Sequence, residues 1–425
     1  MKLNKIYMML GLALLLGSCK SEEPAEPVQT RSVEVPVSFT IQLASEAGGT
    51  RADGPDGTVW DDEEGKTNAG LKEFDNKINT VVPVLYEVVN GTMSATPVAK
   101  MTVQDKKEQG AGNSNVWVIS GVMSCNPGTT EDDLLTKNYR LALFINCDKG
   151  DVKKPLDPEN PGDAKFYHHG IPGQNLDGEA LSEPFESIPM YGVTQINFEK
   201  DGAFIKATGT GTNGKITVNV LRSMAKVRVL LSAALQGKVK LTNLSISRHA
   251  IQGYVCPKKW NTAADFADVA SSAYMRGMTG SSSFYNHVCN TDISTIHHEG
   301  TGGNSENKIG FYLPDTYNSH HDGVTGSDEI KLIISYDIYS KVDGVDTKVA
   351  HHDNPMWFRP VSEWSEEKRK AKEPWDIIRN HIYEFVITGV EPTTGALIVD
   401  VAVKPWVKHE FTEWYEKIPD PTPAN

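Results

Sequence analysis

The first residues of the chain have the types and spacing needed for covalent lipid attachment. Lys2 and Lys5 precede an apolar stretch over residues 6–16, and Gly17-Ser18-Cys19 follows it directly. The stretch is too short to remain as a membrane-spanning helix, so residues 1–18 are predicted to be a removable lipoprotein signal peptide. Small residues before a cysteine suit processing in which the Cys19 thiol forms a thioether to diacylglycerol before cleavage. The alternative is an ordinary secretory signal with a chance cysteine.

The residues after Cys19 are typical of a tether. Residues 20–27 are charged, rich in proline and without large apolar side chains, so they cannot bury a core. No later segment approaches a run of ~18 apolar residues. A lipid on Cys19 is therefore the only membrane attachment that the sequence indicates.

Four further cysteines could form disulfides in an exported protein. Cys125 and Cys147 form one plausible bridge, and Cys256 and Cys289 form another. Buried thiols are an equally good interpretation, because cysteine also behaves as a small hydrophobic residue. The spacing contains neither C-x-x-C nor a zinc-ligand pattern.

Histidine pairs are the nearest signal for metal chemistry. Eight of the twelve histidines occur in four pairs: His168-His169, His297-His298, His320-His321 and His351-His352. Clustered imidazoles can bind transition metals. However, neighbouring residues of a strand point to opposite faces, so a pair on a strand cannot chelate one ion. The pairs lie beside Gly, Asp and Asn, so histidines of surface loops are the favoured interpretation, and we expect no metal site and no cofactor.

The search for catalytic motifs gives no candidate. The sequence lacks G-x-S-x-G, H-E-x-x-H and P-loop patterns, and the acidic residues 61–64 are best explained as solvated loop charges. We therefore expect no enzymatic activity and no catalytic residues. Five tryptophans could instead form a glycan-binding platform, although tryptophans of β-sandwiches more often pack in the core. They are Trp60, Trp260, Trp357, Trp364 and Trp375.

Composition and patterning indicate a mainly all-β fold. The 425 residues include 42 basic and 55 acidic side chains, a net charge of −13 that disfavours nucleic acid. With 36 glycines and 23 prolines, many short apolar runs separated by turn residues predict β-sandwich or barrel-like domains. These runs lie at 80–89, 116–122, 139–146, 204–208, 216–221, 225–232, 239–247, 308–313, 330–339, 382–390 and 396–403. Short helices are predicted at 131–137, 261–272 and 362–378.

The chain is long enough for two domains. The Gly/Thr-rich residues 208–214 are the expected boundary, which divides the chain into an N-terminal domain at 52–210 and a C-terminal domain with its tail at 211–425. Residues 19–51 precede both as the tether and an N-terminal strand.

That N-terminal strand has the clearest periodicity in the sequence. Apolar side chains alternate with polar residues or proline over eleven positions, which is typical of a half-buried strand. The apolar residues are Val33, Val35, Val37, Phe39, Ile41 and Leu43. A loop of turn-forming residues follows at 47–57, with Arg51 in its middle.

Several strings, taken in order, resemble the fimbrillins, the lipoprotein subunits of the type V pili of Bacteroidales bacteria. The resemblance covers residues 16–406 and begins with the signal, the strand and the Arg51 loop. Each string is short and not specific by itself, so the specificity comes from the order of the strings along the chain. The others are residues 139–146 (YRLALFIN), 188–192 (IPMYG), 222–227 (RSMAKV), 311–314 (FYLP), 379–385 (RNHIYEF) and 403–406 (VKPW).

The resemblance implies two tandem transthyretin-like β-sandwich domains and a mode of assembly. A protease, trypsin-like in the best-known members, would cut between Arg51 and Ala52 at the cell surface. The strand at residues 33–43 would then leave, and a strand from another fimbrial subunit would fill its groove. Arg31 is a second candidate, but a cut there would leave the strand in place, and Arg51 could also be an uncut loop residue.

Two functions follow from this sequence. The first is a structural subunit of a fimbria, anchored to the outer membrane by lipid or extracellular after processing, with adhesion to a host or bacterial surface as a further role. The second is a lipid-anchored, glycan-binding protein of a polysaccharide-uptake system that keeps its first strand. The tail at 407–418 alternates only weakly, so it could donate a strand or pack on its own domain.

Overall fold

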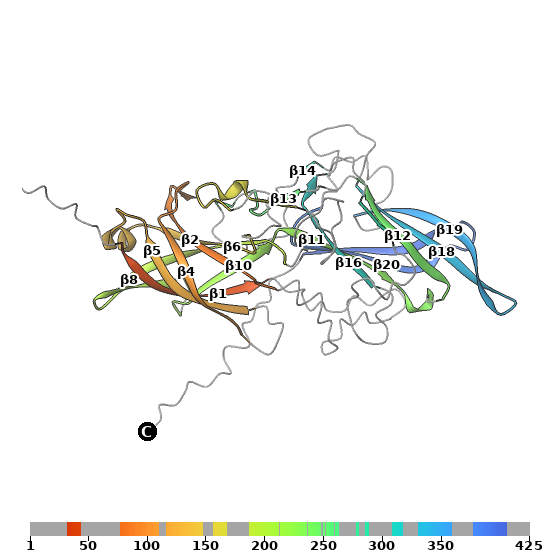
Figure 1. Ribbon diagram of the computed structural model, residues 1–425, viewed down its shortest axis with the longest axis horizontal. Helices are drawn as coiled ribbons and strands as arrows, with labels where there is room; N and C mark the ends of the chain where they lie inside the picture. Colours follow the sequence, from red (N-terminus) through yellow and green to blue (C-terminus); the bar gives the residue numbers. More distant parts are fainter. Residues whose placement is uncertain are drawn as a thin grey trace, which may run out of the picture.

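The computed structural model is nearly all β (Figure 1). It describes residues 32–43, 77–109, 116–147, 156–167, 187–211, 213–235, 237–247, 250, 252–258, 260–262, 278–279, 285–288, 308–317, 330–358 and 377–405. Within these residues, the helical elements are α2 (Glu131–Thr136) and two short 3-10 turns at Pro161–Asp163 and Ala233–Leu235. Helix α2 confirms the first predicted helix, whereas most of 261–272 and 362–378 lies outside the described residues.

The first unit is a sheet that closes on itself. Its pairing order is β10-β1-β5-β4-β2-β6-β8-β9, with β3 attached to β2, and β10 also pairs with β8. The strands are β1 (Glu34–Leu43), β2 (Val81–Val89), β3 (Thr92–Met93), β4 (Ala99–Glu108), β5 (Val116–Cys125), β6 (Tyr139–Ile145), β8 (Met190–Asp201), β9 (Phe204–Gly209) and β10 (Ile216–Arg222). Their inward side chains form one continuous apolar core.

Gly192 allows this closure. It lies on β8 opposite Val220 of β10, and a Cβ atom at this position would lie 2.5 Å from a methyl carbon of Val220. Any larger residue would therefore push β8 and β10 apart at the seam. This explains why a glycine interrupts an otherwise apolar stretch of β8.

The second unit consists of two four-stranded sheets that share a second apolar core. One sheet has the order β16-β11-β20-β21 and the other β15-β12-β18-β19. Their strands are β11 (Met224–Leu231), β12 (Val239–Ser247), β15 (Tyr285–Val288), β16 (Lys308–Pro314), β18 (Lys331–Val342), β19 (Val345–Trp357), β20 (His381–Val390) and β21 (Leu397–Pro405). Two small pairs, β7 (Lys165–Tyr167) with β13 (Gln252–Tyr254) and β14 (Met278–Thr279) with β17 (Thr316–Tyr317), complete the described strands.

The chain passes from the first unit to the second at Ser223. Strand β10 belongs to the first sheet, and β11 begins after this single residue in the second unit. The predicted boundary at 208–214 instead lies between β9 and β10, two strands of the first unit. The Gly/Thr-rich sequence lies at a turn within the first unit. Turn-forming residues have the same composition within a domain and between domains, so this composition alone does not locate a domain boundary.

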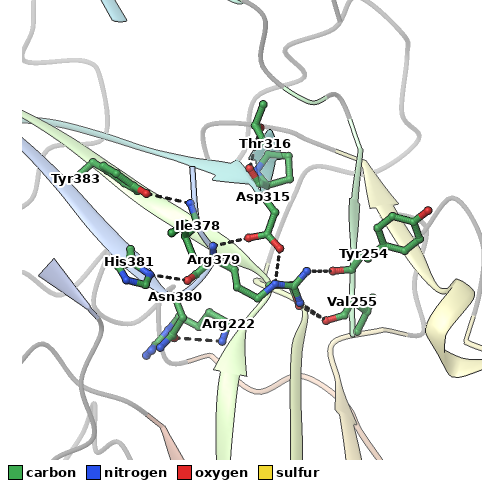
Figure 2. A network of polar contacts seen from close by, with 12 residues as sticks. Arg222, Tyr254, Val255, Asp315, Thr316, Ile378, Arg379, Asn380, His381 and Tyr383 are labelled. Carbon is green, nitrogen blue, oxygen red and sulfur yellow. Dashed lines mark hydrogen bonds and ion pairs between the residues drawn. The ribbon is translucent and has the colours of Figure 1, made fainter. Parts of the chain in front are cut away.

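A buried polar network joins the two units beside Ser223 (Figure 2). The Arg379 guanidinium forms an ion pair with Asp315 (Nε–Oδ2 2.6 Å) and donates to the carbonyl oxygens of Val255 and Tyr254, each at 2.9 Å. Both charged side chains are buried. The backbone N–H of Arg379 also donates to the Asp315 carboxylate. Arg379 is thus held by residues that lie 64 to 125 positions away in the sequence.

Three more hydrogen bonds of this network hold the chain where it passes from β10 to β11. The Asn380 side chain accepts a hydrogen bond from the Arg222 N–H (3.3 Å), and the Asn380 N–H donates to the Met224 carbonyl (2.8 Å). The Ser223 hydroxyl donates to the Val255 carbonyl (2.8 Å). The start of β20 therefore fixes both the end of β10 and the beginning of β11.

Removing the Asp315 carboxylate should strongly destabilise the protein. Asp315→Ala leaves the Arg379 charge buried without its counter-charge, and we expect a loss of about 3–5 kcal/mol in the free energy of unfolding, measured by urea denaturation. The control is Lys137→Ala, which removes an exposed pair with Glu87 (3.3 Å) and should cost less than about 1 kcal/mol. Equal losses in the two variants would contradict this account of the junction.

The stability should also fall on mild acidification because of His381. Burial lowers the pKa of His381, against the opposing effect of its Nδ1–H bond to the Arg379 carbonyl (2.8 Å). The unfolded chain then binds a proton at higher pH than the folded chain, so the stabilisation is complete above about pH 6.5 and is lost progressively below it. We expect the free energy of unfolding to decrease from pH 7 to pH 5, and less steeply in His381→Gln. Identical pH profiles would show that His381 has no part in this dependence.

Candidate functional site: the first strand and its groove

Strand β1 inserts one apolar face into the core of the first unit. Its side chains alternate between exposed or half-buried and buried along its length. Val35, Val37, Phe39, Ile41 and Leu43 are all at most 3% exposed, and Val33 is half-buried just before the strand. The predicted half-buried strand with this set of inward residues is therefore confirmed.

β1 is the strand that closes the first sheet (Figure 1). It pairs antiparallel with β5 from Glu34 to Gln42 and parallel with β10 from Phe39 to Leu43. Among the described residues, no other strand connects β5 to β10. Without β1, the facing edges of β5 and β10 would lose these backbone partners.

Pro36 shows how β1 tolerates a residue without an N–H group. The Cys125 N–H donates to the Val33 carbonyl, so residues 33 and 35 occupy the hydrogen-bonded positions toward β5. Pro36 then falls at a non-hydrogen-bonded position on that side, and pairing with β10 begins only at Phe39. The first half of β1 is therefore held by hydrogen bonds to β5 on one side only.

The central part of β1 has a neighbouring strand on both sides. Phe39 lies opposite Ile119 of β5 and beside Ile216 of β10, and Ile41 lies between Trp117 and Val218 in the same way. Side chains directly across an antiparallel pair are close neighbours on one face. Phe39 and Ile41 are thus flanked on both sides by large apolar residues of β5 and β10.

Asn146 fixes the chain where it re-enters the first unit. Its side chain accepts hydrogen bonds from the N–H groups of Asn79 (2.8 Å) and Thr80 (3.3 Å) and donates to the carbonyls of Lys77 and Ile188 (2.9 Å each). Its backbone is left-handed, with φ 57°. None of these partners belongs to β1.

Lys106 adds a second anchor at the same place. Its ammonium group donates to the carbonyls of Ile78 and Asn79, both at 2.6 Å. Residues 77–80 are therefore held by β4 and by the end of β6. A break in the chain between β1 and residue 77 would leave the start of β2 in place.

The lipidation and processing residues predicted from the sequence lie outside the described residues. These are Cys19, Arg31, Arg51 and Ala52, and the tail from residue 406 also lies outside. The part of the predicted site that the structure describes is the strand that would be removed, together with the groove that this strand occupies. Sequence reasoning missed Asn146 and Lys106, whose partners are 27 to 69 residues away.

The predicted Cys125–Cys147 disulfide does not form. Cys125 is a buried thiol whose pKa burial raises to about 11. Cys125 ends β5 and Cys147 follows β6, and β4 and β2 lie between these strands, a separation on the order of 14 Å along the sheet. A disulfide requires Cα atoms within about 7 Å. The Cys256 thiol donates to the Pro161 carbonyl (3.4 Å), and its suggested partner Cys289 is outside the described residues.

One histidine pair can be placed. His351 Nδ1 contacts the Asp337 carboxylate (2.6 Å), whereas His352 stacks on Tyr336 with ring centroids 5.6 Å apart. The pair lies on strand β19 and not in the loop that we expect from the sequence, and its two imidazoles lie on opposite faces of the strand. In the described parts of the chain, no group of three or more potential ligands could hold a metal ion. The other three pairs lie outside these parts.

The described tryptophans do not gather on one face. Trp260 packs edge-on against Tyr86 at the first core, and Trp357 lies on β19 under the Lys331 ammonium. Trp60, Trp364 and Trp375 are outside the described residues. No helix within the described ranges has the length and hydropathy of a membrane span.

The fold and this site define an all-β protein whose first sheet is closed by its own N-terminal strand. No family model and no curated protein matches the sequence. Among solved structures, the chain is similar to the tip fimbrial protein Mfa3 from Porphyromonas gingivalis with C-terminal truncation (11% identity, TM-score 0.44, 88% of this chain and 100% of that chain). It is also similar to a fimbrial assembly protein from Parabacteroides distasonis (10% identity, TM-score 0.38, 88% and 96%).

Replacing Asn146 should loosen the anchor of β2. Asn146→Ala leaves several backbone groups at residues 77–80 and 188 without their side-chain partner, and we expect a loss of at least about 2 kcal/mol in the free energy of unfolding. Hydrogen exchange of the Asn79 and Thr80 amides should become faster. The control is Asn126→Ala, which removes a single bond from an exposed residue to the Pro97 carbonyl and should cost about 1 kcal/mol or less. Unchanged exchange at Asn79 and Thr80 would refute the anchoring role.

Proposed function

We propose that this chain is a structural subunit of a bacterial cell-surface fimbria and a member of the fimbrillin family. It is exported as a lipoprotein on Cys19 and assembled by strand exchange after proteolysis between Arg51 and Ala52. The observation that carries the proposal is the position of β1, an N-terminal strand that closes the first sheet and continues into the rest of the chain only through residues 44–76.

The energetics of β1 favour exchange over simple release. Burial of its five inward side chains contributes on the order of 10 kcal/mol before entropy costs. After a cut in residues 44–76, β1 would therefore stay bound until another strand supplies equivalent burial and pairing. A vacated groove would expose apolar side chains and two unpaired strand edges, which is a strong driving force for strand addition.

The anchors of β2 support the same sequence of events. Asn146 and Lys106 hold residues 77–80 by contacts that do not involve β1. Proteolysis after Arg51 would thus separate β1 from a first unit whose remaining strands stay in register. The lipid on Cys19 would leave with β1 and release the processed subunit from the outer membrane.

Edge strands of the second unit carry features that oppose pairing with another chain. β19 contains Pro355 and a bulge near Val349, with Asp346 and Lys348 exposed beside it. β21 pairs with β20 across a second bulge and ends at Pro405. Proline, bulges and charges are the common protection of sheet edges. Edge-to-edge association through β19 or β21 is therefore disfavoured, which supports assembly through the β1 groove.

The proposal predicts the N-terminus of the protein on native cells. N-terminal sequencing and intact mass of cell-surface material should show a mature start at Ala52, together with polymers that resist SDS. Arg51→Ala should keep β1 and abolish these polymers, whereas Arg31→Ala should leave processing unchanged. A lipid-blocked Cys19 as the sole N-terminus would contradict the proposal. Polysaccharide binding by that unprocessed form in a gel-shift assay would instead support the glycan-binding lipoprotein.

A further inference from the structure

The groove under β1 specifies the strand that can fill it. Along β1, five positions two residues apart are buried, and the third is Phe39. Phe39 is the largest of the five, and it is also the first residue of β1 that is paired on both sides. Pairing on two sides fixes the register of a strand more tightly than pairing on one. An incoming strand therefore needs an aromatic side chain at its third inward position.

The positions around Phe39 exclude charged side chains. Val37 and Ile41 are at most 3% exposed, and the β5 residues opposite them are Gly121 and Trp117. Neither residue offers a counter-charge. A carboxylate at either position would be buried without an ionic partner, at a cost of several kcal/mol.

Residues 406–418 of this chain do not meet these requirements. With Phe411 aligned on Phe39, His409 replaces Val37 and Glu413 replaces Ile41. In the other alternation, Trp414 aligned on Phe39 places Glu410 and Glu416 at inward positions. Both alignments bury at least one carboxylate in the apolar groove.

The strand before this tail, β21, is already paired within the second unit. β21 alternates Leu397, Val399 and Val401 as buried residues, and it pairs with β20 along its whole length from Leu397 to Pro405. Donating β21 to another subunit would remove a strand from the second core. The apolar alternation of β21 is therefore not available to a neighbour.

We infer that the β1 groove is filled by a strand from a different protein, and not by residues 406–418 of a second copy of this chain. The donor carries apolar residues at five alternate positions with an aromatic residue at the third, and it runs antiparallel to β5. This inference rests on the proposed function. The chain is then one subunit of a polymer that contains more than one kind of protein, and its groove determines which donor strand can bind.

Peptide exchange into the processed protein tests the inference. The full-length mature chain is cut after Arg51, and fluorescent peptides are added while mass spectrometry follows the displacement of β1. The parent peptide comprises residues 32–43, with Phe39→Ala as the test variant and Ser38→Ala as the matched control at an exposed position. A fourth peptide comprises residues 404–418, and a fifth is that tail with His409→Val and Glu413→Ile.

The parent and Ser38→Ala peptides should enter equally well, and Phe39→Ala should bind about 100-fold or more weakly. The tail peptide should not enter, and its repaired form should. Entry of the unmodified tail as readily as the parent would overturn the inference, as would a Phe39→Ala peptide that binds like the parent. Failure of every peptide, the parent included, would instead refute strand exchange and the proposed function.

Discussion

The first unit depends on one constraint, which is that its sheet must be closed by a strand at the N-terminal end of the described chain. Within the described residues, β1 is the strand that lies between β5 and β10, and its inward face is part of the first core. A strand inside a chain is held in place by covalent bonds at both ends. β1 is followed by the long segment 44–76, so a single cut there makes its retention a matter of non-covalent binding alone.

The second unit contains a strand with the same arrangement of neighbours as β1, but this strand is attached to the chain at both of its ends. Strand β11 has the same kind of neighbours as β1, an antiparallel strand on one side (β16) and a parallel strand on the other (β20). However, β11 follows β10 after the single residue Ser223, and the Arg379–Asp315 network holds this crossing. The two units thus share this arrangement of neighbouring strands, and in the proposed mechanism only the N-terminal copy is exchanged.

Much of the fold could be predicted from the sequence because it depends on local alternation. β1, β2 and β6 have strongly apolar inward positions, and their ranges agree with the prediction within a few residues. Strand β4 was missed because Asp105, Lys106 and Lys107 hide its short apolar part, and β19 because residues 345–349 are exposed on both faces. The second pairing of β10, which closes the first sheet, depends on Gly192 and on contacts between distant segments. The Asn146 anchor and the buried Arg379–Asp315 pair likewise join residues 42 to 69 positions apart, which no local pattern encodes.

The central claim is that β1 must leave its groove before subunits assemble, and a reversible lock on β1 tests it most directly. Ser38 and Ser120 lie directly opposite each other on β1 and β5 at a non-hydrogen-bonded pair, whose Cα spacing of about 4.5 Å suits a disulfide. In the double variant Ser38→Cys/Ser120→Cys, cut after Arg51 on native cells that supply the other fimbrial subunits, SDS-resistant polymers containing this chain should be absent under oxidising conditions and return on reduction, while Ser38→Cys alone assembles normally in both. Equal assembly of the oxidised and reduced double variant would contradict the account.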